Sequence, residues 1–295
     1  MTPDPVFRQD LFAGKRILVT GGGTGLGREI AAKYLALGAT IWICGRRQAV
    51  LEETAGALMR EHGGTVKAHA VDIRDAAAVD AMVETIWADG PLTGLVNNAA
   101  GNFISPTQAI SPRGFDAIAN TVLHGTFYVT NAVGKRWIRD RLPGSIVSIV
   151  TTWVWTGSPF TVPSAMAKSG LDAMTKSLAI EWGRYGIRAN AIAPGVFPTE
   201  GMTARLDPGA DAEARGVENP MGRVGRMPEL QNLATFLMAD GCEWLTGQTI
   251  AIDGAGHLAY GAQMTRLFAL SDEDWARKRA LIKAQDAADK ARRSV

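Results

Sequence analysis

The stretch RILVTGGGTGLG, residues 16–27, decides the fold. It begins with an aliphatic run typical of a buried strand, passes through a cluster of glycines, and continues into a segment with apolar residues at helical spacing. Glycines at such a junction let the backbone turn sharply and approach a pyrophosphate, and the helix N-terminus offers free N–H groups and a positive dipole end. The stretch therefore predicts a dinucleotide-binding strand–turn–helix unit.

Short aliphatic runs and longer helical stretches alternate along the rest of the chain. Strands are predicted at 16–20, 40–44, 66–71, 94–96, 145–150, 188–193 and 248–252, and helices at 26–37, 49–60, 76–88, 113–139, 165–182 and 229–238. Strands that alternate with helices form βαβ units and a parallel sheet buried on both faces. We therefore predict a single doubly wound, Rossmann-type α/β domain with a parallel sheet of about seven strands.

Two segments fall outside this alternation. Residues 196–222 are rich in proline, glycine and charge and are long for a connection, so they are either a substrate lid or an excursion without structure of its own. The stretch 271–293 begins like a capped helix and ends in cations that suit a helix C-terminus. We expect residues 1–256 to form the α/β domain, with the lid around 196–222, and residues 257–295 to form a helical extension.

Composition excludes several classes of protein. The 295-residue chain is 46% hydrophobic, and its 31 Lys and Arg against 29 Asp and Glu are too balanced for binding nucleic acid or a membrane surface by bulk charge. Two cysteines cannot form a disulfide framework, and neither a secretory leader nor roughly 18 unbroken apolar residues are evident, so we expect a cytoplasmic protein. His62, His69 and His257 lie in separate segments without metal-ligand spacing, and no metal is predicted.

The end of the second predicted strand indicates which nicotinamide cofactor fits. An acidic residue there would hydrogen-bond a ribose 2′-hydroxyl and repel a 2′-phosphate. The sequence instead has Arg46 and Arg47, which either hold a phosphate bidentately or begin a solvated helix. The missing acid and the two guanidinium groups favour NADP(H).

Several ordered motifs make residues 14–254 similar to the short-chain dehydrogenase/reductase family. Residues 20–27 resemble its T-G-x-x-x-G-x-G motif, and residues 97–101 (NNAAG) resemble its N-N-A-G stretch with one alanine inserted. Asp72 and Ile73 match the place where the family contacts the adenine. Pro194, Gly195 and Thr199 match the segment that holds the nicotinamide amide. The resemblance implies a cofactor site formed by Thr20, Gly21, Gly23, Thr24, Gly25, Leu26, Gly27, Arg46, Arg47, Asp72, Ile73, Asn98, Ala99, Lys168, Pro194, Gly195 and Thr199.

The family's catalytic residues are mostly replaced in this chain. The usual Tyr-x-x-x-Lys begins with Ser164 and keeps Lys168, while Thr151 stands at the usual Ser and Val122 at the usual Asn. Ketone reduction needs a proton donor of tunable pKa at the ketone oxygen, and an aliphatic hydroxyl is a much weaker acid than a phenol. Ordinary carbonyl reduction is therefore disfavoured.

One branch of the family, the 2,4-dienoyl-CoA reductases, also carries Ser at the tyrosine position. Residues 97–106 (NNAAGNFISP), 162–168 (VPSAMAK) and 204–208 (ARLDP) resemble that branch. The resemblance implies that a tyrosine before the Ser and an asparagine on the long helix hold the thioester oxygen, and Trp153 and His124 stand at those positions here. The candidate catalytic residues are Lys168, Ser164, His124, Thr151 and Trp153, although His124 is also compatible with a structural histidine and Trp153 with a pocket wall.

Reduction of a conjugated thioester places hydride on a distal carbon and negative charge on the thioester oxygen, so it needs preorganised donors at that oxygen. We expect NADPH-dependent reduction of an unsaturated acyl-CoA, above all a trans-2,4-dienoyl-CoA, in unsaturated fatty-acid breakdown. The resemblance implies a homo-oligomer, a tetramer, and we expect no nucleic-acid or membrane partner. Two alternatives stay open: an oxidoreductase acting on another enone or carbonyl substrate, and a non-catalytic NADP-binding relative.

Overall fold

Seven strands form one all-parallel sheet in the order β3-β2-β1-β4-β5-β6-β7. The structure is a computed structural model that describes residues 6–199, 219–259, 267 and 269–281. The strands are β1 (Arg16–Thr20), β2 (Thr40–Gly45), β3 (Thr65–Ala70), β4 (Gly94–Asn97), β5 (Gly144–Ile149), β6 (Ile187–Pro194) and β7 (Thr249–Ile252). The predicted doubly wound α/β fold is confirmed, and the strand order reverses between β1 and β4.

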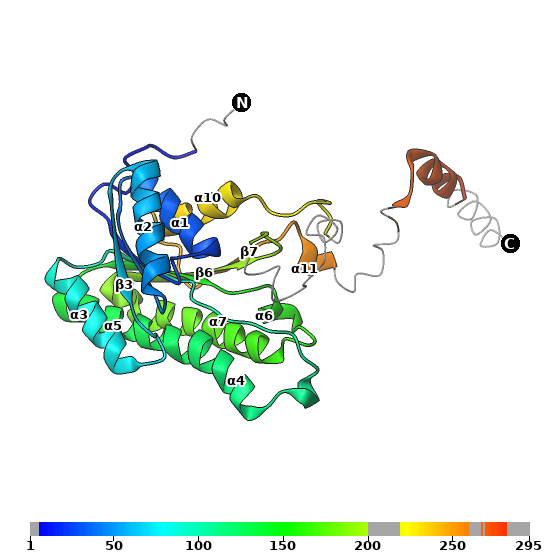
Figure 1. Cartoon of the computed structure of the whole chain (residues 1–295). Helices are drawn as coiled ribbons and strands as arrows, with labels where there is room; N and C mark the ends of the chain where they lie inside the picture. The colour runs from blue at the N-terminus through cyan, green and yellow to red at the C-terminus, as the bar shows by residue number, and fades with distance from the viewer. Residues whose placement is uncertain (1–5, 200–218, 260–266, 268, 282–295) are drawn as a thin grey trace. The chain divides into compact units, whose positions relative to one another are not determined.

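Helices cover both faces of the sheet (Figure 1). One face carries α1 (Gly25–Ala36), α2 (Gln48–His62) and α10 (Met227–Met238), and the other carries α3 (Ala76–Ala88), α4 (Pro112–Ala119), α5 (Gly125–Asp140) and α7 (Val162–Trp182). Because successive side chains of a strand point to opposite faces, Ile17 and Val19 of β1 pack in the first layer and Leu18 packs in the second. Both faces of the central strands are therefore buried, as a parallel sheet requires.

Shorter elements connect this framework. They are the 3₁₀ turn η1 (Thr107–Ala109), the π-helical turn η2 (Asn120–His124), α6 (Trp153–Thr156), the 3₁₀ turn η3 (Gly183–Tyr185) and α11 (Gly256–Ala259). Within the described residues, no helix is both long and apolar enough to cross a membrane.

The single helix expected over residues 113–139 is interrupted by η2, between α4 and α5. The extra residue of a π turn rotates the side chains that follow it. Val122 is fully buried here, packed with Ala167 and Leu171 of α7. Gly125 comes directly after η2 and begins α5. A Cβ on Gly125 would lie 2.7 Å from Ile73 Cγ1, so the start of α5 lies very close to the segment that follows β3.

The chain divides into two compact units, residues 1–257 and 258–295. The roles expected for them, a catalytic domain and a helical extension, stay predictions. The expected lid lies mostly on residues 200–218, outside the described residues. The expected helix at 271–293 is described only as far as residue 281, and residues 272–281 are helical.

Parallel strands bring their carboxyl ends to one edge of the sheet. In α/β folds, ligands bind in the crevice outside this edge, where the strand order reverses. The segments that leave the edge here contain Gly21 after β1, Arg46 after β2, Asp72 after β3, Asn98 after β4, Thr151 after β5, Gly195 after β6 and Asp253 after β7.

Candidate active site

The glycine-rich turn between β1 and α1 is shaped by close backbone contacts. Gly21 and Gly25 have φ of +63° and +56°, in the left-handed region that favours glycine. A Cβ on Gly21 would lie 2.9 Å from Ala99 Cα, and one on Gly27 would lie 2.6 Å from the Gly21 carbonyl oxygen. Larger residues at Gly21 and Gly27 would therefore push the turn away from the segment after β4.

The N-terminus of α1 is open for an anion. Its N-cap residue, Thr24, makes no side-chain capping hydrogen bond within the described structure, and the first turn contains no acidic residue. The first N–H groups of a helix lack intrahelical partners and carry the positive end of the helix dipole. The turn and the helix start together fit a cofactor pyrophosphate.

Hydrogen bonds tie this turn to the segment after β4. Thr20 Oγ1 accepts the N–H groups of Asn98 and Ala99, each at 3.0 Å, and donates to the Val96 carbonyl at 3.3 Å. The Asn98 amide nitrogen donates in turn to the carbonyls of Thr20 and Gly21, at 3.0 and 3.2 Å. These bonds fix the crevice at the point where the strand order reverses.

Positive charge gathers at the ends of β2 and β3. Arg46 and Arg47 are exposed just after β2. Asp72 accepts hydrogen bonds from Arg74 Nε at 2.9 and 3.0 Å. The Arg74 guanidinium holds the pKa of Asp72 below its usual range, and the charge of Arg46 acts in the same direction. The sequence did not lead us to expect Arg74 in the cofactor site, although it follows Asp72 by only two positions.

Ser164 and Lys168 are buried one turn apart on α7, each 4% exposed. Lys168 Nζ donates a hydrogen bond to the Ile149 carbonyl at the end of β5. Burial lowers the pKa of the Lys168 ammonium to about 8. A buried cation at the carboxyl edge suits a site that must hold polar groups and developing negative charge.

The connection after β5 carries two further candidate residues. Thr151 is half-buried, and its Oγ1 accepts the N–H of Trp153 at 3.2 Å. Trp153 begins α6 and is itself half-buried. Since Lys168 is bonded to the last residue of β5, Thr151 and Lys168 belong to the same end of that strand.

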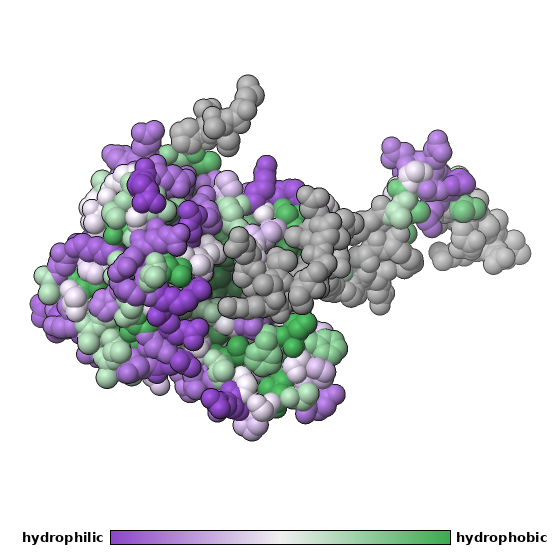
Figure 2. All heavy atoms as spheres, in the orientation of Figure 1, coloured by the Kyte–Doolittle hydropathy of each residue, from purple (hydrophilic) through white to green (hydrophobic). Residues whose placement is uncertain are grey.

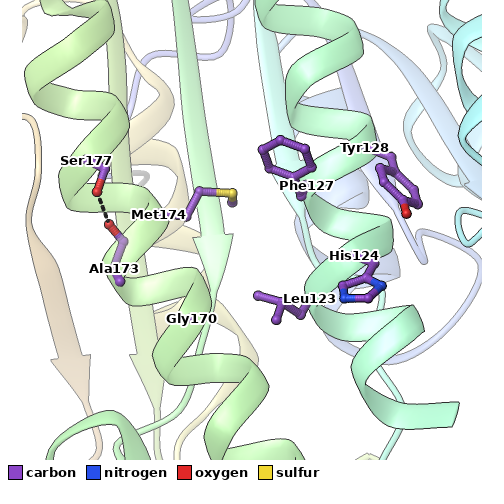
Figure 3. A pocket seen from close by; sticks show the side chains of 8 residues that line it. All are labelled: Leu123, His124, Phe127, Tyr128, Gly170, Ala173, Met174 and Ser177. Atoms are coloured by element: carbon purple, nitrogen blue, oxygen red, sulfur yellow. Dashed lines mark hydrogen bonds between the residues drawn. The ribbon is translucent and has the colours of Figure 1, made fainter. Parts of the chain in front are cut away.

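His124 lies elsewhere. It is exposed at the end of η2 and lines a groove of about 430 Å³ with Phe127 and Tyr128 of α5. Figure 3 shows Met174 of α7 across this groove, which is also lined by Leu123, Gly170, Ala173 and Ser177. Neither Ser164 nor Lys168 lines the groove: both are buried on α7, whereas His124 is exposed.

Asn102 is a polar group at the carboxyl edge that sequence reasoning passed over. It lies half-buried in the segment after β4, and its Oδ1 accepts the N–H of Phe103 at 2.9 Å. Its amide nitrogen has no protein acceptor in the part of the chain that the structure describes, and is therefore available as a donor. The signal was its place in residues 97–106 (NNAAGNFISP), which resemble the dienoyl-CoA reductases, although Asn102 itself was not assigned a role.

Among the described residues, no group of three or more His, Cys, Asp or Glu side chains lies close enough together to hold a metal ion. The candidate donors named so far at the carboxyl edge include the hydroxyls of Thr151 and Ser164, the amide of Asn102 and the ammonium of Lys168. Such groups donate hydrogen bonds to oxygen and phosphate.

Comparison with known proteins assigns the family. A family model described as Enoyl-(Acyl carrier protein) reductase matches residues 21–257. A probable 2,4-dienoyl-CoA reductase of Caenorhabditis elegans is 42% identical over 294 residues, which is 97% of this chain and 95% of the relative. An uncharacterized oxidoreductase of the same organism is 41% identical over 286 residues, 94% of this chain and 91% of the relative.

Among solved structures, a gluconate 5-dehydrogenase from Burkholderia cenocepacia, in complex with NADP and tartrate, is similar with a TM-score of 0.79. It is 31% identical, and the match covers 85% of this chain and 98% of that one. With the glycine turn, the parallel sheet and the retained lysine on α7, these matches establish that the chain belongs to the short-chain dehydrogenase/reductase family. It is a short-chain oxidoreductase related to the dienoyl-CoA reductases.

Proposed function

We propose that the protein is an NADPH-dependent reductase of unsaturated acyl-CoA thioesters, with trans-2,4-dienoyl-CoA as its substrate, in the breakdown of unsaturated fatty acids. The observation that carries the proposal is the buried pair on α7, where Lys168 is retained and the aliphatic hydroxyl of Ser164 stands in place of a phenol. The name of the C. elegans relative supports the same substrate class.

The groups at the carboxyl edge of the sheet are suited to bind NADP(H). The open N-terminus of α1 suits a pyrophosphate, and Arg46 and Arg47 suit a 2′-phosphate. The NADP complex of the Burkholderia structure supports this choice. When bound, the cofactor supplies the hydride.

The chain's own residues hold the substrate oxygen and its charge. Reduction of a dienoyl thioester adds hydride at a distal carbon, moves negative charge onto the thioester oxygen, and ends with a proton from solvent on carbon. Ser164 and Thr151 would donate hydrogen bonds to this oxygen from hydroxyls, and Asn102 from its amide. Lys168 would hold the nicotinamide ribose and make the local potential more positive, and Trp153 would form the wall beside these donors.

A second copy of the chain would cover the groove between α5 and α7. Phe127 is 48% exposed there, and the groove is lined mainly by apolar and small side chains. We infer a homo-oligomer that uses this face, and a tetramer by family resemblance. In this assembly His124 would lie at a subunit contact. We also place the protein in the cytoplasm, since its two cysteines, Cys44 and Cys242, are unpaired.

A substrate panel tests the proposed function. The purified protein with NADPH should turn over 2,4-dienoyl-CoA, with little or no turnover of 2-enoyl-CoA or simple ketones. Ser164→Ala and Asn102→Ala should each lower kcat while the affinity for NADPH stays nearly unchanged. Tight NADPH binding without turnover of any substrate would favour the non-catalytic alternative, and turnover of ketones alone would favour a carbonyl reductase.

A further inference from the structure

An aromatic stack joins two segments that are far apart in the sequence. The ring centroids of Trp155 in α6 and His257 in α11 are 4.8 Å apart, and the ring planes differ by 30°. In Figure 1, α6 and α11 both lie at the right-hand end of the sheet. The segments that carry them leave the carboxyl ends of β5 and β7, so the stack belongs to the edge where the candidate donors lie.

The imidazole in this stack is held firmly. His257 Nδ1 lies 2.8 Å from Asp253 Oδ2, which also accepts the His257 N–H at 2.8 Å. The other carboxylate oxygen accepts the N–H of Ala255, whose φ of +64° shows how tightly this turn is wound. Because a carboxylate accepts hydrogen bonds, Nδ1 carries the proton in this contact. The side chains of Asp253 and His257 are only 6% and 16% exposed, so the ring has little room to turn.

The indole, by contrast, is only partly covered. Trp155 is 45% exposed although His257 packs against it. Figure 2 shows hydrophobic residues gathered over the region of α6. Phe160, four residues past the end of α6 in the chain, is also exposed. A large aromatic ring that is rigidly supported on one side and open on the other is suited to receive a flat apolar group.

The position of Trp155 in the chain indicates which part of a ligand it would meet. It lies in the connection between Thr151, at the end of β5, and Ser164, on the first turn of α7. These hydroxyls are the proposed donors to the thioester oxygen, so a substrate bound to them would bring its acyl end toward the connection that carries Trp155. Only a conjugated acyl group is flat over several carbons, whereas a saturated chain is not.

We propose that Trp155 is a substrate-binding residue whose indole stacks on the conjugated dienoyl part of the thioester, and that His257, fixed by Asp253, is the positioning residue that supports the indole. This inference rests on the proposed function, since it names the group by which the same site selects conjugated substrates. Loss of an aromatic contact of this kind should weaken binding about two- to tenfold.

The test compares 2,4-hexadienoyl-CoA, 2,4-hexadienoyl-pantetheine and hexanoyl-CoA, with binding measured by titration calorimetry on the NADP⁺-loaded protein and turnover measured with NADPH. Trp155→Ala should raise the Kd and KM of both dienoyl thioesters about two- to tenfold, change kcat little, and leave hexanoyl-CoA binding unaltered. Trp155→Phe should retain most of the affinity. His257→Ala should reproduce part of the loss, and His257→Phe, which keeps a ring under the indole, should restore it.

Trp244→Ala is the matched control, because Trp244 is fully exposed in the loop after α10 and should change none of these values. A loss confined to the CoA thioester would mean that Trp155 meets the nucleotide, and an equal loss with hexanoyl-CoA would mean an unselective apolar wall. Either result would overturn the inference, as would unchanged binding in both Trp155 variants. If the wild-type protein reduces no dienoyl thioester, the proposed function fails, while the calorimetric arm still decides whether Trp155 selects conjugated ligands.

Discussion

Replacement of Lys168 by Met should stabilise the protein at neutral pH while it removes cofactor binding. The pKa of this lysine is lowered to about 8 by burial, from an ordinary value of 10.5. Each pKa unit between the folded and unfolded states is worth about 1.4 kcal/mol, so burial of the charge costs about 3 kcal/mol. Met leaves the buried Ile149 carbonyl without this donor, which costs about 1–3 kcal/mol. We therefore expect a net gain of up to roughly 2 kcal/mol at pH 7.

The gain should depend on pH in a defined direction. Below about pH 8 the folded protein holds the charged lysine, and the full cost of burial is present. Between about 8 and 10.5 the unfolded chain binds more protons than the folded one, so wild-type stability rises relative to Lys168→Met. Above about 10.5 the lysine is neutral in both states, and the variant should be the less stable by about 1–3 kcal/mol because only the lost hydrogen bond remains.

Urea unfolding at pH 7, 9 and 10.5 measures this difference, with Lys176→Met as the control. Lys176 lies on the same helix but is half exposed and paired with Asp172, so its replacement should change stability by only a few tenths of a kcal/mol at each pH. Calorimetry with NADPH on both variants checks the cofactor. A Lys168→Met variant that is destabilised equally at all three pH values would refute the reasoning.

Four further outcomes are expected. Arg46→Ala and Arg47→Ala should each weaken NADPH binding by roughly tenfold or more and leave NADH nearly unchanged, and equal losses for both cofactors by calorimetry would argue against a 2′-phosphate contact. Thr20→Val leaves the Asn98 and Ala99 N–H groups without an acceptor and should lower the unfolding free energy by about 2–4 kcal/mol, with Thr85→Val on the exposed face of α3 as control. Gly21→Ala should lower both stability and NADPH affinity, because its φ of +63° is strained for alanine and its Cβ meets Ala99; unchanged affinity would show that the turn relaxes. His124→Ala should retain turnover and alter only the sedimentation behaviour, whereas a 10²–10³-fold loss of kcat would return His124 to the donors.

The sequence was sufficient to predict the parallel sheet and the helices that alternate with its strands. Strands and helices can be predicted from local patterns, because aliphatic runs alternate with stretches of helical apolar spacing along the chain. The glycines at residues 21–27 likewise predict the turn after β1, and the parallel sheet follows from the alternation. The π turn at η2 was not foreseen, because its apolar spacing continues that of the helices on either side. Within this turn Val122 is buried and His124 is exposed.

Contacts between segments that are far apart in the chain could not be predicted from the sequence either. Trp155 and His257 are about one hundred residues apart in the chain, and only the order of β5, β6 and β7 brings their rings together. His257 was considered as a metal ligand alone, so its carboxylate partner was not sought. Asp253 lies close to it in the chain, but the tight turn at Ala255 that directs its oxygens to His257 is a feature of the folded backbone.

Deuterium transfer tests the central claim most directly. The wild-type protein is incubated with 2,4-hexadienoyl-CoA and NADPH that carries deuterium at the transferable C4 position, and the product is examined by mass spectrometry. We predict one deuterium in the acyl chain for each NADPH consumed, on a distal carbon of the former diene, and the second new hydrogen from solvent. Absence of deuterium from the acyl chain, while NADPH binds and a ketone is reduced, would contradict the assignment.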